Sequence, residues 1–264
     1  MGAIAVFVST DDGCRLSVIP GSKGAVPLVL SNSLGTDHSL WESQMAAFSH
    51  QRAVWRYDTR GHGDSDVVAG DYSIERLGKD LVSVMDATGA ARVDLCGVSI
   101  GGLTALWVAL HAPDRVRRVV LANTAARIGD VGMWSARIET VRADGLGALA
   151  DATMTRWFTP EFRAAKPEVV ARFHATIAQA DAAGYAGCCA ALRDADLRAL
   201  VSQVACPTLV VTGRRDPATP PAQGRWLAEQ IAGAQLLELE AAHLSNVERS
   251  ADFNAAVLDF TLRE

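Results

Sequence analysis

Long apolar runs are missing from this sequence. No stretch of about 18 or more uncharged apolar residues occurs among its 264 residues, so no membrane-spanning helix is expected. The apolar segment Met1–Val8 has neither the basic start nor the small-residue cleavage site of a signal peptide. It is therefore predicted to be a first strand.

Paired cysteines and basic tracts are also lacking. Five cysteines, an odd number without Cys-x-x-Cys spacing, indicate neither a disulfide framework nor a zinc site, and the cytoplasm is the expected compartment. No His-Glu-x-x-His pattern occurs, so no metal site is expected. A net charge of -5 without a basic tract argues against nucleic acid or an anionic membrane as the partner. The sequence carries no signal for the oligomeric state.

Eight short β-rich segments are present and predict the sheet. They are Ala3–Val8, Arg15–Ile19, Val26–Leu30, Arg52–Tyr57, Arg92–Cys96, Val116–Ala122, Thr208–Thr212 and Leu236–Leu239. Asp11-Asp12-Gly13 separates the first two and is a hairpin signal, whereas helical patterns intervene from the third segment onward. The sequence therefore predicts an α/β fold with an eight-stranded, mostly parallel sheet and helices on both faces.

Residues 125–200 lack the β pattern and carry apolar residues at helical spacing. Glycine and proline divide this segment into about four helices. We expect a helical cap inserted between strands six and seven of a core formed by residues 1–124 and 201–264. The cap carries Trp134 and Trp157 near Arg127, Arg137 and Arg156, which makes it the best source of a lid and an anion-binding pocket.

The segment Gly97-Val98-Ser99-Ile100-Gly101 follows a predicted strand and precedes an apolar helical run. A Gly-x-Ser-x-Gly turn in this context is typical of a nucleophile elbow, in which a strained turn exposes the serine hydroxyl above the sheet. Ser99 is therefore the candidate nucleophile. The loop Ser31–Asp37 follows the third strand, and the backbone amides of Leu34 and Ile100 are candidate donors of an oxyanion hole.

A candidate acid and a candidate base follow the last two strands. Asp216 comes after Thr208–Thr212, and His243 comes after the final strand, so both lie at the sheet edge that carries Ser99. Asn123 follows the sixth strand, where some hydrolases of this architecture place their acid, so the acid here must come from elsewhere. His62 lies between two glycines and is interpreted as a scaffold residue.

These motifs resemble the α/β-hydrolase superfamily, and in particular the 3-oxoadipate enol-lactonases. The resemblance spans almost the whole chain and depends on four blocks: 32–36, 57–63, 96–103 and 121–126. The second block is widespread among α/β-hydrolases, whereas Asn32-Ser33 stands where many relatives have His-Gly. Ile100 stands where methionine or leucine is frequent, a change that should spare the backbone donor.

The resemblance implies an α/β-hydrolase fold and a cofactor-free hydrolysis of 3-oxoadipate enol-lactone in aromatic-compound catabolism. By the same resemblance, Ser99 is the nucleophile, His243 the base and Asp216 its orienting acid, in the family's chain order. The cap would hold the carboxylate of this small anionic lactone. Trp134 is the first candidate for that role, followed by Arg127 and Arg137.

Other functions use the same motifs. A carboxylesterase or a C–C bond hydrolase acting on ring-cleavage products would keep the triad and change only the pocket. Haloalkane dehalogenation is disfavoured because Ser99 stands where an aspartate nucleophile is needed. A small-molecule sensor on this fold would turn over rarely and would change its surface on ligand binding, whereas an enzyme would show multiple turnovers.

Overall fold

The eight predicted strands form a single sheet. The structure is a computed structural model that describes residues 4–22 and 26–263, so Ala3 of the predicted first strand lies outside the described residues. The strands are β1 (Val6–Ser9), β2 (Arg15–Ile19), β3 (Pro27–Ser31), β4 (Ala53–Tyr57), β5 (Val93–Val98), β6 (Val116–Ala122), β7 (Thr208–Gly213) and β8 (Gln235–Leu239). Their order in the sheet is β1-β2-β4-β3-β5-β6-β7-β8. The predicted α/β fold with a mostly parallel sheet is confirmed.

The sheet is antiparallel only at one edge. β1 and β2 form the predicted hairpin, and β2 pairs antiparallel with β4, whereas all the remaining pairs are parallel. β5 lies between β3 and β6, with Leu95 opposite Val29 on one side and Val119 on the other. Every residue of β5 is buried, as expected for a strand covered on both faces. The loop after this central strand therefore opens at the middle of the sheet edge.

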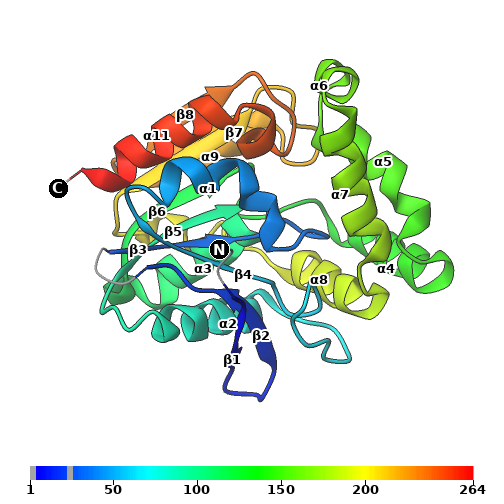
Figure 1. Ribbon diagram of the computed structural model, residues 1–264, viewed down its shortest axis with the longest axis horizontal. Helices are drawn as coiled ribbons and strands as arrows, with labels where there is room; N and C mark the ends of the chain where they lie inside the picture. Colours follow the sequence, from blue (N-terminus) through cyan, green and yellow to red (C-terminus); the bar gives the residue numbers. More distant parts are fainter. Residues whose placement is uncertain (1–3, 23–25, 264) are drawn as a thin grey trace.

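Helices cover both faces of the sheet. Figure 1 shows α1 and α11 together on one face and α2 and α3 on the other. Ser73 caps α2 by accepting the Arg76 amide, as its side chain and position predict. The helices outside the cap are α1 (Glu42–Phe48), α2 (Ile74–Ala87), α3 (Ile100–His111), α9 (Pro221–Gln230), α10 (Ser245–Glu248) and α11 (Ser250–Leu262). Three short 3-10 segments, η1 (His38–Trp41), η2 (Pro113–Arg115) and η3 (Val201–Gln203), join them.

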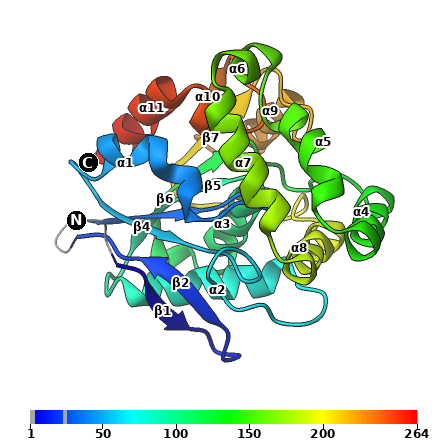
Figure 2. The same cartoon turned by 45° about the vertical axis from the view of Figure 1, so that its right-hand side comes forward.

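Five helices, rather than the expected four, separate β6 from β7. They are α4 (Val131–Asp144), α5 (Gly147–Trp157), α6 (Pro160–Ala165), α7 (Pro167–Gln179) and α8 (Ala182–Asp194). The extra break is at Lys166, whose backbone is not helical, and Pro167 then starts α7 at a position that proline favours. Figure 2 shows these helices gathered beyond one end of the sheet. The division into a core and a cap stays a prediction.

None of the helices in the described part of the chain combines the length and apolar character that a membrane span needs.

Candidate active site

Ser99 occupies a tight turn between β5 and α3. Its φ of 58° lies in the left-handed region, which is strained for a residue with a Cβ. A Cβ on Gly97 would lie 2.2 Å from the Gly101 carbonyl oxygen, and a Cβ on Gly101 would lie 2.2 Å from that of Ser31. Only glycine permits these approaches. The Ser99 amide donates to the Ala122 carbonyl at 3.0 Å and holds the turn against β6.

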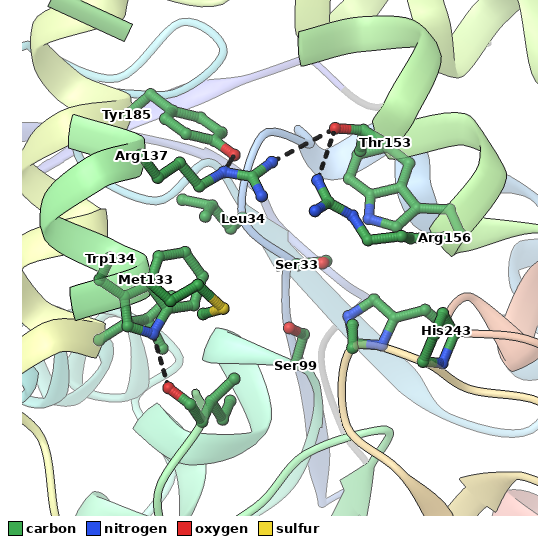
Figure 3. Close-up of a pocket in the computed structure, with 15 residues that line it drawn as sticks. Ser33, Leu34, Ser99, Met133, Trp134, Arg137, Thr153, Arg156, Tyr185 and His243 are labelled. Carbon is green, nitrogen blue, oxygen red and sulfur yellow. Dashed lines mark hydrogen bonds between the residues drawn. The ribbon is translucent and has the colours of Figure 1, made fainter. Parts of the chain in front are cut away.

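The candidate base and acid come from the loops after β8 and β7. His243 Nδ1 lies 2.8 Å from Asp216 Oδ2, and both side chains are buried. Because Nδ1 faces the carboxylate, Nε2 is the ring nitrogen left for the serine. Figure 3 shows the His243 ring beside the Ser99 hydroxyl, and both residues line one cavity. The structure thus brings Ser99, Asp216 and His243 to one edge of the sheet.

The Asp216 carboxylate is surrounded by donors. Oδ1 accepts the amides of Ala218 at 2.8 Å and Thr219 at 3.0 Å. Oδ2 accepts the Thr219 hydroxyl at 2.7 Å and Asn123 Nδ2 at 2.9 Å, in addition to the His243 ring. Burial alone would raise the pKa of Asp216, but the charge of His243 and these hydrogen bonds hold it below its ordinary value. The carboxylate is therefore ionised where it faces the imidazole.

Leu34 lies in the loop after β3 and lines the cavity. The Gly35 amide donates to His62 Nε2 at 2.9 Å, and Asn32 Nδ2 donates to the Tyr57 carbonyl at 2.7 Å. Burial lowers the pKa of His62, so its ring is neutral and can accept this bond. His62 therefore supports the loop that carries Leu34, in agreement with the scaffold role expected for it.

Ile100 is the first residue of α3 and follows Ser99 directly. Amides in the first turn of a helix have no carbonyl partner within that helix, and this end carries a partial positive charge. Within the described ranges, no protein acceptor takes the amide of Leu34 or of Ile100. Leu34 lines the cavity and Ile100 follows the cavity residue Ser99, so their role as oxyanion donors stays a prediction.

The cavity has a volume of about 160 Å³ and separates the sheet-edge loops from the cap. Its cap side is formed by residues of helices α4, α5 and α8, namely Met133, Trp134, Arg137, Thr153, Arg156, Trp157, Tyr185 and Leu192. No acidic side chain is among the residues that line it. Because its two charged groups are both arginines, the cavity favours an anionic ligand.

The two cavity arginines are held by neutral groups. Arg137 Nε donates to the Tyr185 hydroxyl at 2.8 Å, and its guanidinium lies over the rings of Trp134 and Tyr185. The Thr153 hydroxyl accepts one hydrogen bond from Arg137 Nη2 at 3.3 Å and one from Arg156 Nη2 at 3.4 Å. Burial, together with the charge of Arg137, lowers the pKa of Arg156. Neither guanidinium forms an ion pair with any carboxylate in the described part of the chain.

The predicted cap residues differ in where they lie. Arg137 and Trp134 both line the cavity, but the Trp134 indole donates to the Ile128 carbonyl at 2.6 Å and presents an apolar wall rather than a donor. Arg127 is not among the residues that line this cavity and lies 3.6 Å from the carboxylate of Asp196, so its contact with the ligand stays a prediction. Arg156 lines the cavity together with Arg137.

Thr153 and Tyr185 also line the cavity without having been singled out from the sequence. Thr153 lies three residues before Arg156 on one helix, a spacing that puts both on one face. That spacing was a usable signal. Tyr185 comes from α8, and no local pattern links it to Arg137.

The cap is also bonded to the loop that carries His243. The amide of Leu244 donates to the Trp157 carbonyl at 3.1 Å. Glu248 accepts the Ala242 amide at 3.0 Å and the Thr159 hydroxyl of the cap. The end of α5 and the start of α6 are thereby joined to the residues on either side of His243.

The described residues contain no group of three or more His, Cys, Asp or Glu side chains that could hold a metal ion. The expected independence of metals and cofactors stays a prediction.

Comparisons with known proteins agree with this architecture. A 3-oxoadipate enol-lactonase of Acinetobacter baylyi is 45% identical over 230 residues, covering 87% of this chain and 86% of its own. A second one from the same organism is 38% identical over 250 residues, covering 94% of each chain. The crystal structure of an enol-lactonase from Burkholderia xenovorans matches with a TM-score of 0.95 and 43% identity, covering 98% of this chain and 100% of that one.

These matches confirm the resemblance inferred from the sequence motifs. The family model described as the alpha/beta hydrolase fold matches residues 26–250. The chain therefore belongs to the alpha/beta hydrolase fold family and is an ester-bond hydrolase of the serine class.

Proposed function

We propose that this enzyme hydrolyses 3-oxoadipate enol-lactone to 3-oxoadipate in aromatic-compound catabolism, through a triad of Ser99, His243 and Asp216. The relatives named as enol-lactonases support the substrate. The observation that carries the proposal is the cavity itself, in which Ser99 and His243 lie opposite two arginines without carboxylate partners. The cytoplasm remains the expected compartment.

The substrate carboxylate binds at the cap side of the cavity. Arg137 and Arg156 keep guanidinium N–H groups that the protein does not use, and charge-assisted bonds to a carboxylate are among the stronger hydrogen bonds in proteins. The Tyr185 hydroxyl accepts from Arg137 and so retains its own proton for the ligand. Burial raises the pKa of Tyr185, which keeps this donor neutral. The lactone ring is then directed toward Ser99.

The first half of the reaction opens the ring. His243 Nε2 takes the Ser99 proton as Oγ attacks the lactone carbonyl carbon, and Asp216 stabilises the resulting imidazolium. The carbonyl oxygen becomes an oxyanion and accepts hydrogen bonds from the backbone N–H groups of Leu34 and Ile100. Collapse breaks the bond between the acyl carbon and the ring oxygen. The ring oxygen leaves as an enolate, takes a proton from His243, and tautomerises to a ketone.

The second half releases the acyl group. His243 removes a proton from a water molecule, and the hydroxide adds to the acyl carbon of the Ser99 ester. The second tetrahedral intermediate collapses, the bond to Ser99 Oγ breaks, and the serine recovers its proton from His243. The product leaves as a dicarboxylate. Because the leaving enol has become a ketone, ring closure is disfavoured.

The decisive experiment follows the ultraviolet absorbance of the enol lactone after addition of purified protein. We expect rapid, repeated turnover, and far slower hydrolysis of uncharged aryl esters, because these leave both arginines without an anionic partner. Protein that hydrolyses aryl esters and leaves the lactone intact would refute the substrate. A single slow turnover on every ester would favour a ligand sensor instead.

A further inference from the structure

Asn123 contacts the proposed acid from the end of β6, where a neutral residue stands in place of a carboxylate. Its φ of 44° is left-handed, a conformation that asparagine tolerates better than most residues. The Asn123 amide N–H donates to the Val211 carbonyl at 2.8 Å and so fixes this turn against β7. The turn takes the chain out of the strand and directs the side chain toward the Asp216 loop.

The Asn123 side chain connects three loops. Its Nδ2 donates to Asp216 Oδ2 at 2.9 Å and to the Ala242 carbonyl at 3.2 Å, next to His243. Its Oδ1 accepts the hydroxyl of Ser245, the first residue of α10. Asn123 is 1% exposed and Ser245 is 0% exposed. The buried side-chain amide of Asn123, which itself follows β6, therefore connects the loops after β7 and β8.

The chemistry of its neighbours fixes the orientation of this amide. The Asp216 carboxylate and the Ala242 carbonyl can only accept, so the NH₂ end must face them. The reverse orientation would place the amide oxygen against two other oxygens. Ser245 then supplies the donor that the remaining Oδ1 requires.

We infer that Asn123 is a positioning residue for the triad, one that holds the Asp216 carboxyl group and the His243 loop in register. The inference rests on the proposed roles of Asp216 and His243. Asn123 Nδ2 donates to the same carboxylate oxygen that faces His243 Nδ1, so it fixes that oxygen and withdraws part of its negative charge from the imidazole. Because Asn123 is neutral, Asp216 is the single carboxylate that it leaves beside His243.

The test replaces Asn123 with Ala and with Asp and measures kcat, KM and the pH profile with an uncharged aryl ester. Asn123→Ala should lower kcat about tenfold, the cost of one hydrogen bond to a charged group, and leave KM nearly unchanged. The acid limb of its profile should move to higher pH, because more carboxylate charge then stabilises the imidazolium form. Asn123→Asp places a second carboxyl group against Asp216, and the two should share a proton, so the acid limb should be displaced and should show the extra titration of this pair.

Other charged groups near His243 remain the same in these variants. Glu248 accepts the Ala242 amide, and Arg156 lines the same cavity. Asn246→Ala is the matched control, because it removes a buried amide from α10 that donates to the Leu40 carbonyl and to Gln44 Oε1 and not to Asp216. We expect this control to lower the unfolding temperature and to leave the acid limb in place.

Two results would overturn the inference. One is a profile of Asn123→Ala and Asn123→Asp that superimposes on that of the unmodified enzyme. The other is an equal displacement of the acid limb in Asn246→Ala, which would indicate a general loss of stability. Should Asn123→Ala not fold, the nearly isosteric Asn123→Asp decides alone. Because the substrate is an aryl ester, failure of the enzyme on the enol lactone would refute the proposed substrate and not this inference.

Discussion

The two walls of the cavity differ in how far the protein itself satisfies their polar groups. On the sheet side, the Asp216 carboxylate accepts five hydrogen bonds from other residues of the chain. On the cap side, Arg137 and Arg156 meet only hydroxyl groups and aromatic rings. The protein thus satisfies the triad carboxylate on the sheet side, whereas on the cap side it leaves guanidinium N–H groups for the anionic substrate that we propose. Loss of a group from the first should change kcat, and loss from the second should change KM.

The largest effect is expected from Ser99→Ala, which tests the sheet wall. Removal of a triad nucleophile costs about 10⁴-fold or more in kcat, because only the oxyanion donors and substrate binding remain. The loss should be the same for the enol lactone and for an aryl ester. A serine-directed fluorophosphonate should label the unmodified enzyme and not the variant. Stoichiometric labelling of Ser99→Ala would place the nucleophile elsewhere.

An intermediate effect is expected from Arg137→Ala and Arg156→Ala, which test the cap wall. Each should raise KM for the anionic lactone about tenfold to a hundredfold, the range for one charge-assisted hydrogen bond, with little change in kcat. KM for an uncharged aryl ester should remain nearly constant.

Arg127→Ala is the matched control for the cap arginines, because Arg127 pairs with Asp196 outside the cavity. Steady-state kinetics on both esters measure the difference. Equal changes for charged and uncharged esters would remove the distinction between the two walls.

The smallest effect concerns the loop that carries Leu34. Burial lowers the pKa of His62 in the folded protein, whereas its pKa in the unfolded chain is about 6.5. At a pH between these two pKa values, His62 is protonated in the unfolded chain and neutral in the folded protein. His62 therefore costs stability as pH falls below about 6.5. His62→Gln, which can still accept the Gly35 amide, should make the free energy of unfolding less dependent on pH between 7 and 5.

The pKa of His38 is shifted in the opposite direction to that of His62, so its effect on stability has the opposite pH dependence. Hydrogen bonding to Asp58 raises the pKa of His38, although burial opposes it, so its contribution is present at low pH and is lost as pH rises through the folded value. Urea titrations of His62→Gln and His38→Gln at several pH values separate the two. An unchanged slope in His62→Gln would show that its ring is not kept neutral by burial.

The sheet side of the cavity could be predicted because its information is local. The segment around Ser99 contains a strand, a glycine turn and an apolar helix in consecutive residues. Asp216 and His243 each follow a strand directly, and parallel strands end at one edge. The sequence around Asn123 indicates only that this residue is not acidic, because its contact with Asp216 depends on the loop after the neighbouring strand β7.

The cap side could not be predicted at the same level, because helix packing decides which side chains enter the cavity. Arg127 and Arg156 both belong to the predicted cap, and the packing of α4 against α5 and α8 decides that Arg156 lines the cavity with Arg137. Tyr185 reaches the same place from a third helix. The break at Lys166 was missed although Pro167 follows it.

Two hydrogen bonds, from the Leu244 amide to the Trp157 carbonyl and from the Thr159 hydroxyl to Glu248, join the cap helices to the His243 loop. Helices transplanted from a protein without a hydroxyl side chain at the position of Thr159 would lose the bond to Glu248 and would hold the His243 loop less firmly. A chimaeric enzyme of this kind has to exchange residues 157–159 and 242–248 together if it is to gain a new specificity without losing its rate.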